Sequence, residues 1–160
     1  MKVVGIDLAG KPENETGFCY LSDNGAQTII LHTDMEILRE IESLKPDIVA
    51  IDAPFWVPKV GMWRPCEEKL IKRGFQPIST VFPSMKMLVM RAAHLVRVLE
   101  SRGYKTIEVF TKASEKILGL KKEYRKNQNE YDALVAALTG KAYLEGKYEN
   151  LDGIILPKYS

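Results

Sequence analysis

The sequence has few of the residues that build zinc sites and disulfide scaffolds. Its 160 residues include two cysteines and two histidines. Cys19 and Cys66 form no CxxC pair, and neither His32 nor His94 has a second histidine at ligand spacing. The pattern excludes a zinc finger and a disulfide framework, and we expect all four side chains to be structural.

Long apolar runs and a strong net charge are also absent. The longest apolar runs are far below the ~20 residues that a membrane span needs, and Met1-Lys2 leads directly into a strand-like run rather than a signal peptide. We therefore expect a cytoplasmic protein with no membrane partner. The 23 basic and 21 acidic side chains give a net charge of +2, so overall charge favours neither nucleic acid nor anionic membranes.

The composition that remains is typical of a globular protein. Hydrophobic residues make up 46% of the chain and charged residues 28%. A chain of this length suits one domain with a real core, and we predict a single domain over residues 1–160.

Hydrophobic periodicity predicts an α/β fold. We expect strands over residues 2–8, 16–22, 26–31, 47–53 and 104–110, and helices over residues 34–44, 66–73, 84–102 and 129–146. The first three strands are joined by short turns and should be antiparallel, whereas the later two are of the buried, parallel type. The result is a mixed five-stranded sheet with helices on both faces.

Three local features refine this prediction. Thr33 and Glu36 form a capping-box pattern at the start of the first helix. Residues 54–83 are rich in proline, glycine and tryptophan and form an insertion between elements. Residues 154–156 either add a short terminal strand or dock against the core.

Two aspartates occupy matched positions in the predicted sheet. Asp7 and Asp52 each lie near the C-terminal end of an otherwise apolar run. A buried carboxylate needs a partner, hydrogen bonds or a cation, and ligands of open α/β sheets gather beyond the carboxyl ends of parallel strands. Each aspartate could instead cap a turn, but the matched pair favours a site.

A third aspartate lies on the last predicted helix. Residues 129, 132, 133, 136, 137 and 140 share one face, which is smooth apart from its N-terminal end. This face would let the helix lie close to the sheet, with Asp132 projecting towards the strand ends. The alternative is a surface aspartate that complements the helix dipole.

Three converging carboxylates repel one another, and a divalent cation removes that repulsion. Oxygen ligands without histidine or thiolate favour Mg²⁺ or Mn²⁺ over zinc. The sequence therefore predicts a magnesium or manganese site at Asp7, Asp52 and Asp132.

The motifs and their order resemble a known family. They are GIDLAG (5–10), VAIDAPF (49–55), RPCEEKLIKRG (64–74), EVF (108–110) and YDALVAALTG (131–140). This series is similar to the domain-of-unknown-function family described as predicted RNase H-like nucleases, within the RNase H-like superfamily. The last motif also resembles the final helix of RuvC-type resolvases, where the residue three before the aspartate is often acidic. Here it is Asn129.

The resemblance implies a nuclease that hydrolyses phosphodiester bonds with two metal ions. Asp7 would bridge both ions, Asp52 would hold one and Asp132 the other. Because Asn129 replaces an acidic residue, the fourth ligand stays open between Glu130 and Glu108. We favour an exposed edge-strand position for Glu108 instead.

Nucleic acid, either RNA or DNA, is the partner that this activity implies, and a homodimer is left open. Two basic segments could hold its backbone: residues 112–128 carry six basic against two acidic side chains, and residues 59–73 carry five against two. The side chains we select as phosphate contacts are Arg64, Lys121, Lys122 and Arg125. Such runs are often only solvated faces.

Two other functions remain open. GIDLAG also resembles the phosphate loop of actin-like ATPases and sugar kinases, so the chain could bind a nucleotide or phosphate without cleaving nucleic acid. Those proteins use a hydroxyl-rich turn and two such domains, neither of which this sequence provides. The fold could also be a non-catalytic module with a vestigial acidic site.

Overall fold

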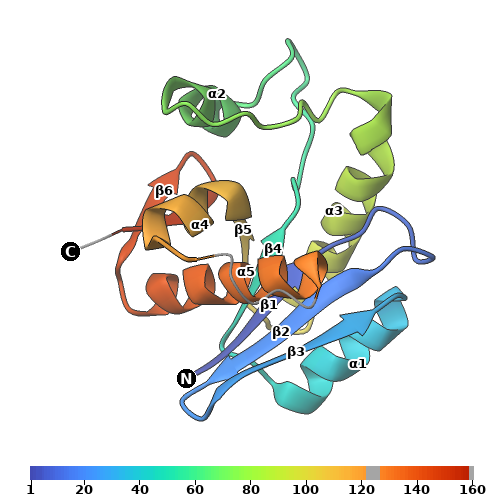
Figure 1. The fold of residues 1–160 in the computed structure, drawn as a ribbon. Coiled ribbons are helices and arrows are strands. Elements are labelled where there is room, and N and C mark those ends of the chain that lie inside the picture. The colour runs from blue at the N-terminus through green and yellow to red at the C-terminus, as the bar shows by residue number, and fades with distance from the viewer. Residues whose placement is uncertain (122–126, 159–160) are drawn as a thin grey trace.

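A seven-stranded mixed sheet forms the centre of the protein in a computed structural model that describes residues 1–121 and 127–158 (Figure 1). The strands are β1 (Lys2–Asp7), β2 (Thr16–Ser22), β3 (Gly25–Leu31), β4 (Ile48–Asp52), β5 (Thr106–Val109), β6 (Tyr148–Leu151) and β7 (Ile154–Pro157). Their order is β3-β2-β1-β4-β5-β7-β6. Strands β1, β4, β5 and β7 are parallel, while β3, β2 and β6 join the sheet by antiparallel pairing.

The prediction of five strands was wrong, because the C-terminal residues add a hairpin. Strands β6 and β7 pair around Asp152 and Gly153, which both have positive φ angles, of 49° and 114°. Asp-Gly between two strand-like runs is a common hairpin signal. Strand β7 then pairs with β5, which confirms the strand rather than the docking alternative for residues 154–156, and β7 is internal to the sheet.

The helices agree with the sequence prediction except for one. They are α1 (Asp34–Leu44), α2 (Pro65–Lys72), α3 (Lys86–Ser101), α4 (Thr111–Leu118) and α5 (Gln128–Leu144), with a short 3₁₀ helix η1 (Pro83–Met85) before α3. The predicted capping box of Thr33 and Glu36 is present. Helix α4 was not predicted, because its lysines obscured the buried side that contains Ala113. None of the described helices is long and apolar enough to cross a membrane.

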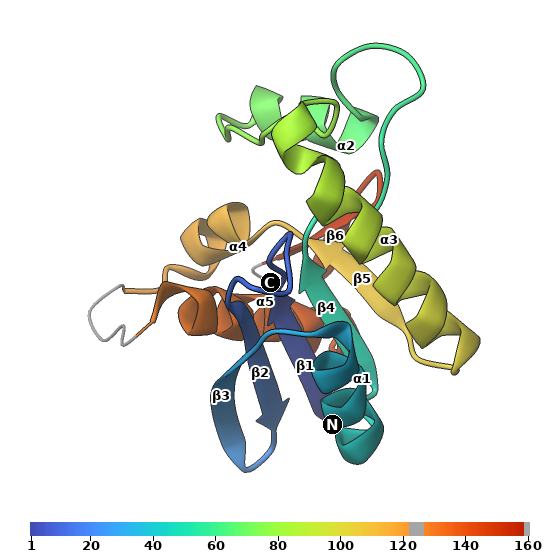
Figure 2. The same cartoon turned by 90° about the vertical axis from the view of Figure 1, so that its right-hand side faces the viewer.

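The helices cover both faces of the sheet. Helices α1 and α3 pack on one face with Val4, Ile6 and Ile51, and α5 packs on the other with Val3 and Ala50. Figure 2 shows α1 and α3 on the side of the sheet opposite α5. Because side chains alternate along a strand, odd-numbered positions of β1 and even-numbered positions of β4 face α5.

Small residues bring α5 very close to the sheet, as its smooth face predicted. A Cβ atom on Gly5 would overlap backbone atoms of Ala133 and Ala137. A Cβ on Gly17 would overlap the carbonyl group of Asn129. The N-terminal end of α5 therefore rests on β2 beside the end of β1, since Gly17 is the register partner of Asp7.

The segment 54–83 lies over the C-terminal ends of the central strands (Figures 1 and 2). Its helix α2 has a core of its own, in which Cys66 and Leu70 pack against Ala113 of α4 and against Leu151 and Ile154 of the C-terminal hairpin. The segment is thus anchored to the body of the protein by an apolar cluster that includes the unpredicted hairpin.

Candidate metal-binding site

Asp7 and Asp52 are neighbours at the C-terminal ends of two adjacent parallel strands. The register of β1 and β4 pairs Val3 with Ile48 and continues in step to Asp7 with Asp52. Paired residues on neighbouring strands point to the same face, and here that face is the one covered by α5. The fold therefore brings two carboxylates that are 45 residues apart in sequence to one edge of the sheet.

Helix α5 brings Asp132 to the same edge. Its residues lie over the sheet in order, with Asn129 above Gly17, Ala133 above Gly5 and Gly140 above Val3. The N-terminal end of the helix is thus at the strand ends where Asp7 lies. Asp132 is half-buried there, and its Oδ1 accepts a hydrogen bond of 2.8 Å from Gln128 Nε2.

The carboxyl of Asp7 is held away from its ordinary charge state. Burial, followed by the charges of Asp52 and Asp132, raises the pKa of Asp7 from 3.8 to about 8. All three effects disfavour the ionised form. Asp7 therefore gains the most from a positive charge placed among the three aspartates.

Thr111 holds the carboxyl of Asp52. Its hydroxyl donates a hydrogen bond of 2.8 Å to Asp52 Oδ2, and its backbone N–H lies 3.5 Å from Oδ1. Burial raises the pKa of Asp52 to about 6, with the charges of Asp132 and Glu108 adding to the rise, while the Thr111 hydrogen bonds oppose it. Thr111 is the first residue of α4, which explains why sequence analysis, lacking that helix, missed it.

The donor chemistry of the three aspartates suits a hard divalent cation. Carboxylate oxygens are the ligands of Mg²⁺ and Mn²⁺, and the mutual repulsion of these carboxyls is the instability that a cation relieves. In residues 1–121 and 127–158, no group of three or more acidic, histidine or cysteine side chains is already arranged around a metal position. The aspartates are thus within electrostatic reach of one another rather than preformed as a cage.

The prediction that Glu108 lies on an exposed edge strand was wrong. Strand β5 is internal, between β4 and β7, and Glu108 is 6% exposed. Its neighbours Ile107 and Val109 face α5, so its side chain points to the opposite face from Asp52. Its oxygens accept hydrogen bonds from Arg64 Nη1 and Nη2, at 2.9 and 2.6 Å, and from Phe55 N at 3.0 Å.

Arg64 is the partner of that glutamate and is 1% exposed. Its guanidinium also lies against Glu67, with Nε and Oε2 3.3 Å apart, and over the ring of Trp56 at 5.3 Å. The selection of Arg64 as a phosphate contact is therefore corrected, because its charge is used to neutralise buried carboxylates. The signal available in the sequence was the RxxE spacing of residues 64–67, which forms an internal ion pair.

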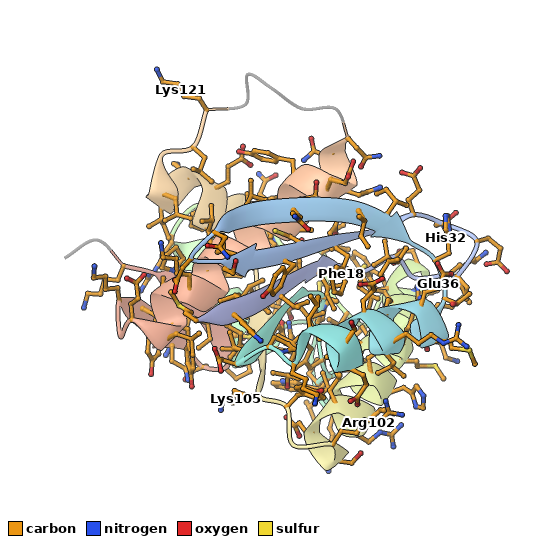
Figure 3. The ribbon with its side chains drawn as sticks, turned by 90° about the horizontal axis from the view of Figure 1, so that it is seen from below. Phe18, His32, Glu36, Arg102, Lys105 and Lys121 are labelled. Carbon is orange, nitrogen blue, oxygen red and sulfur yellow. The ribbon has the colours of Figure 1, made fainter. Side chains whose placement is uncertain are left out.

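The other candidate ligand and the basic residues have different positions. Glu130 lies over β3, where it accepts a hydrogen bond from the Thr28 hydroxyl. Lys121 is exposed and projects outward beyond the end of α4 (Figure 3). Lys122 and Arg125 lie outside the described residues.

One structural arginine was missed by sequence analysis. Arg91, 8% exposed, lies on α3 and donates to the carbonyl oxygen of Ala9 at 2.7 Å, to that of His32 at 2.6 Å and to Asp34 Oδ1 at 2.8 Å. It thereby joins the loop after Asp7 to the start of α1, where His32 and Glu36 lie together (Figure 3). Its position three residues after Leu88, on the apolar side of the helix, was the available signal.

A cavity of about 240 Å³ opens beside Asp7 and Asp52. Its polar lining at the strand ends includes these two aspartates and Glu108, and the rest of the lining includes residues of segment 54–83, Leu88 of α3 and Ile154 of β7. Lys112 of α4 lines it and is exposed. The candidate site is therefore partly enclosed.

Comparison with solved structures shows a shared fold. RuvC of Thermus thermophilus superposes with a TM-score of 0.52 and 16% identity, over 91% of this chain and 97% of the RuvC chain. At that identity the likeness establishes the fold alone. No curated protein matches the chain.

A family model does match the sequence. It is described as "Protein of unknown function (DUF429)" and covers residues 5–102, which include Asp7 and Asp52 and exclude Asp132. The match agrees with the resemblance drawn from the motifs. The chain belongs to the DUF429 family, and its fold is the RNase H-like fold found in RuvC.

Proposed function

We propose that this protein is a nuclease that hydrolyses phosphodiester bonds with Mg²⁺ or Mn²⁺ held by Asp7, Asp52 and Asp132. The observation that carries the proposal is the pairing of Asp7 with Asp52 at the ends of adjacent parallel strands. The charge of Asp132, from α5, acts on both of them. The RuvC-like fold supports this proposal.

Each aspartate has a distinct role in the proposal. Asp7 is paired with Asp52 on the neighbouring strand, and the charges of both Asp52 and Asp132 raise its pKa, so its carboxylate would hold cations together with each of the other two. Thr111 fixes the orientation of Asp52 through its hydroxyl. When bound, the two cations supply an activated water and stabilise the leaving oxygen of the phosphodiester.

The protonation of Asp7 couples this site to cations. With a pKa of about 8, Asp7 keeps its proton near neutral pH when no cation is present. A carboxylate must lose its proton to bind a metal. Cation binding should therefore release a proton, and the site should bind cations more tightly as pH rises towards 8.

Basic residues on α4 and just beyond its end support nucleic acid as the substrate. Lys112, Lys116 and Lys121 are exposed, and Lys112 lines the cavity beside the aspartates. An ammonium group at this position could hold a phosphate of the backbone next to the scissile one. This replaces the phosphate contact that Arg64 cannot make.

Nucleotide or phosphate binding without hydrolysis is the second candidate function. The observation that favours it is the cavity of about 240 Å³, because small-ligand sites are concave and largely apolar. Retention of a mononucleotide by a protein that cleaves no polymer would select this function.

The decisive experiment is a cleavage assay on single- and double-stranded DNA and RNA, a hybrid duplex and a branched junction, with Mg²⁺, Mn²⁺ or chelator. Wild type should cleave at least one substrate only when a cation is present, and Asp7→Asn and Asp52→Asn should lower the rate at least about a hundredfold, or ~2.7 kcal/mol. Asp23→Asn is the matched control, since Asp23 is 80% exposed in the β2–β3 turn. Equal rates for wild type and both site variants would refute the proposal.

A further inference from the structure

The cavity beside the aspartates has a mostly apolar lining that the proposed chemistry does not use. Hydrolysis requires cations and phosphate, yet the lining also includes Pro77 and Ile78 of segment 54–83 and Leu88 of α3. An apolar wall next to a phosphate site is suited to the flat, uncharged part of a ligand.

Segment 54–83, which lines part of the cavity, is held to the body of the protein at two places. Glu108 on β5 binds the segment at both Phe55 and Arg64, through three hydrogen bonds of 2.6–3.0 Å. Beyond Arg64, Leu70 of α2 is fully buried in the cluster with the C-terminal hairpin. The enclosure is therefore a built part of the fold.

The size of the cavity limits what it can hold. Its volume of about 240 Å³ is below the roughly 300–1,000 Å³ of sites that enclose drug-sized ligands. One ring system can enter, whereas a paired duplex, whose bases are stacked and covered, cannot present a ring there without unpairing it.

We propose that this cavity binds the base of a single unpaired nucleotide next to the scissile phosphate, so that the enzyme acts on unpaired positions of a strand and not on continuous duplex. The base lies against Ile78 and Leu88, and exposed Gln76 at the rim can hydrogen-bond to its edge. Lys112, which also lines the cavity, holds a phosphate of the same strand. This inference rests on the proposed nuclease function.

Ile78→Trp tests the inference by filling the cavity from its exposed side. Ile78 is 54% exposed and lines the cavity, so the larger side chain should obstruct it with little effect on the core. Ile71→Trp is the matched control, because Ile71 is 40% exposed on α2 and is not among the residues that line the cavity. Thermal unfolding of both variants checks that the fold is kept.

Binding is measured by calorimetry with oligothymidylate, with thymidine monophosphate and with a fully paired duplex, all with Mg²⁺. We expect Ile78→Trp to weaken oligothymidylate binding at least about tenfold, and Ile71→Trp to change it less than about twofold. Oligothymidylate should also bind more tightly than the monophosphate, because Lys112 contacts the strand. Equal affinity of wild type and Ile78→Trp would overturn the inference, as would tighter binding of duplex than of oligothymidylate. If the monophosphate binds and oligothymidylate does not, the claim that the cavity takes a base from a nucleic acid strand is overturned.

Cleavage separates this inference from the nuclease proposal. A duplex with one unpaired nucleotide should be cut at least about tenfold faster than its fully paired counterpart, and Ile78→Trp should remove that preference. If cleavage depends on Asp52 but ignores pairing and Ile78→Trp, the cavity inference fails and the nuclease proposal stands. If oligothymidylate binds as expected but nothing is cleaved, the nuclease proposal fails, and of the cavity inference only the binding of an unpaired base stands.

Discussion

Replacing Asp7 by asparagine should stabilise the cation-free protein at alkaline pH. Asparagine has nearly the same shape as aspartate but cannot carry the charge that this environment disfavours. The environment consists of burial together with the charges of Asp52 and Asp132, which raise the pKa of Asp7 from 3.8 to about 8. Most substitutions of partly buried residues destabilise a protein, so a gain would be specific to this explanation.

The sign follows from proton binding. Because the folded protein holds the proton of Asp7 up to about pH 8 and the unfolded chain loses it near pH 4, the folded state binds more protons between these values. Stability from this group is fully present below about pH 4 and is lost as pH rises through 8. The rise in the pKa of Asp7 sets an upper limit of roughly 5–6 kcal/mol on the stability lost as pH rises. Because Asp7 is partly exposed, we expect a smaller loss, of about 2–4 kcal/mol.

Urea denaturation in chelator at pH 5 and pH 9 measures this difference. Asp7→Asn should match wild type within about 1 kcal/mol at pH 5 and exceed it by about 2–4 kcal/mol at pH 9. Asp23→Asn should follow wild type at both values, since Asp23 is exposed and far from the site. The reasoning is refuted if Asp7→Asn gains no stability over wild type between pH 5 and pH 9. Saturating Mg²⁺ should then stabilise wild type, by about 2.7 kcal/mol at a hundred times its Kd, and the variant less.

Three other changes test the structure around the site. Gly17→Ala should lower the free energy of unfolding by about 2–4 kcal/mol and weaken Mn²⁺ binding, because the added Cβ displaces the first turn of α5. The control is Gly10→Ala, whose Cβ would meet only ordinary contacts at 3.6–3.8 Å. Urea denaturation and Mn²⁺ titration should show no change for the control. Arg64→Met should lower the free energy of unfolding, measured by urea denaturation, by about 3–5 kcal/mol, because it leaves Glu108 buried without its partner. Adding Glu108→Gln to that variant should recover part of the loss. No recovery would contradict the stabilising role of the ion pair. The Thr111 hydroxyl donates a hydrogen bond that lowers the pKa of Asp52, so Thr111→Val should raise that pKa above about 6. The pH midpoint of Mn²⁺ binding should then move upward. An unchanged midpoint would contradict the role given to Thr111.

The parts of the fold that follow from local pattern were predictable. The near-continuous apolar runs of residues 2–8 and 47–53 indicated strands buried on both faces, and the smooth face of residues 129–140 indicated a helix in close contact with the sheet. From these, the common edge for Asp7 and Asp52 followed by the geometry of parallel strands alone. The structure confirms this arrangement through the register of β1 and β4.

The parts that depend on tertiary contacts were not predictable from pattern. Glu108 was expected at an exposed edge because nothing in residues 104–110 indicates that β7 will cover that edge. Arg64 was expected to face solvent because its partner is 44 residues away in sequence. Thr111 was missed because helix α4 was not predicted. The lysines of α4 obscure the apolar pattern of its buried side, which becomes clear only from its packing against α2 and the C-terminal hairpin.

The most direct test of the central claim is a crystal structure of the protein grown or soaked with Mn²⁺, with anomalous diffraction used to locate the metal. We predict a manganese peak at coordination distance from carboxylate oxygens of both Asp7 and Asp52, with Asp132 turned towards it, and loss of that peak in Asp52→Asn. A saturated crystal with no manganese between Asp7 and Asp52, or with manganese bound only elsewhere, would contradict the account.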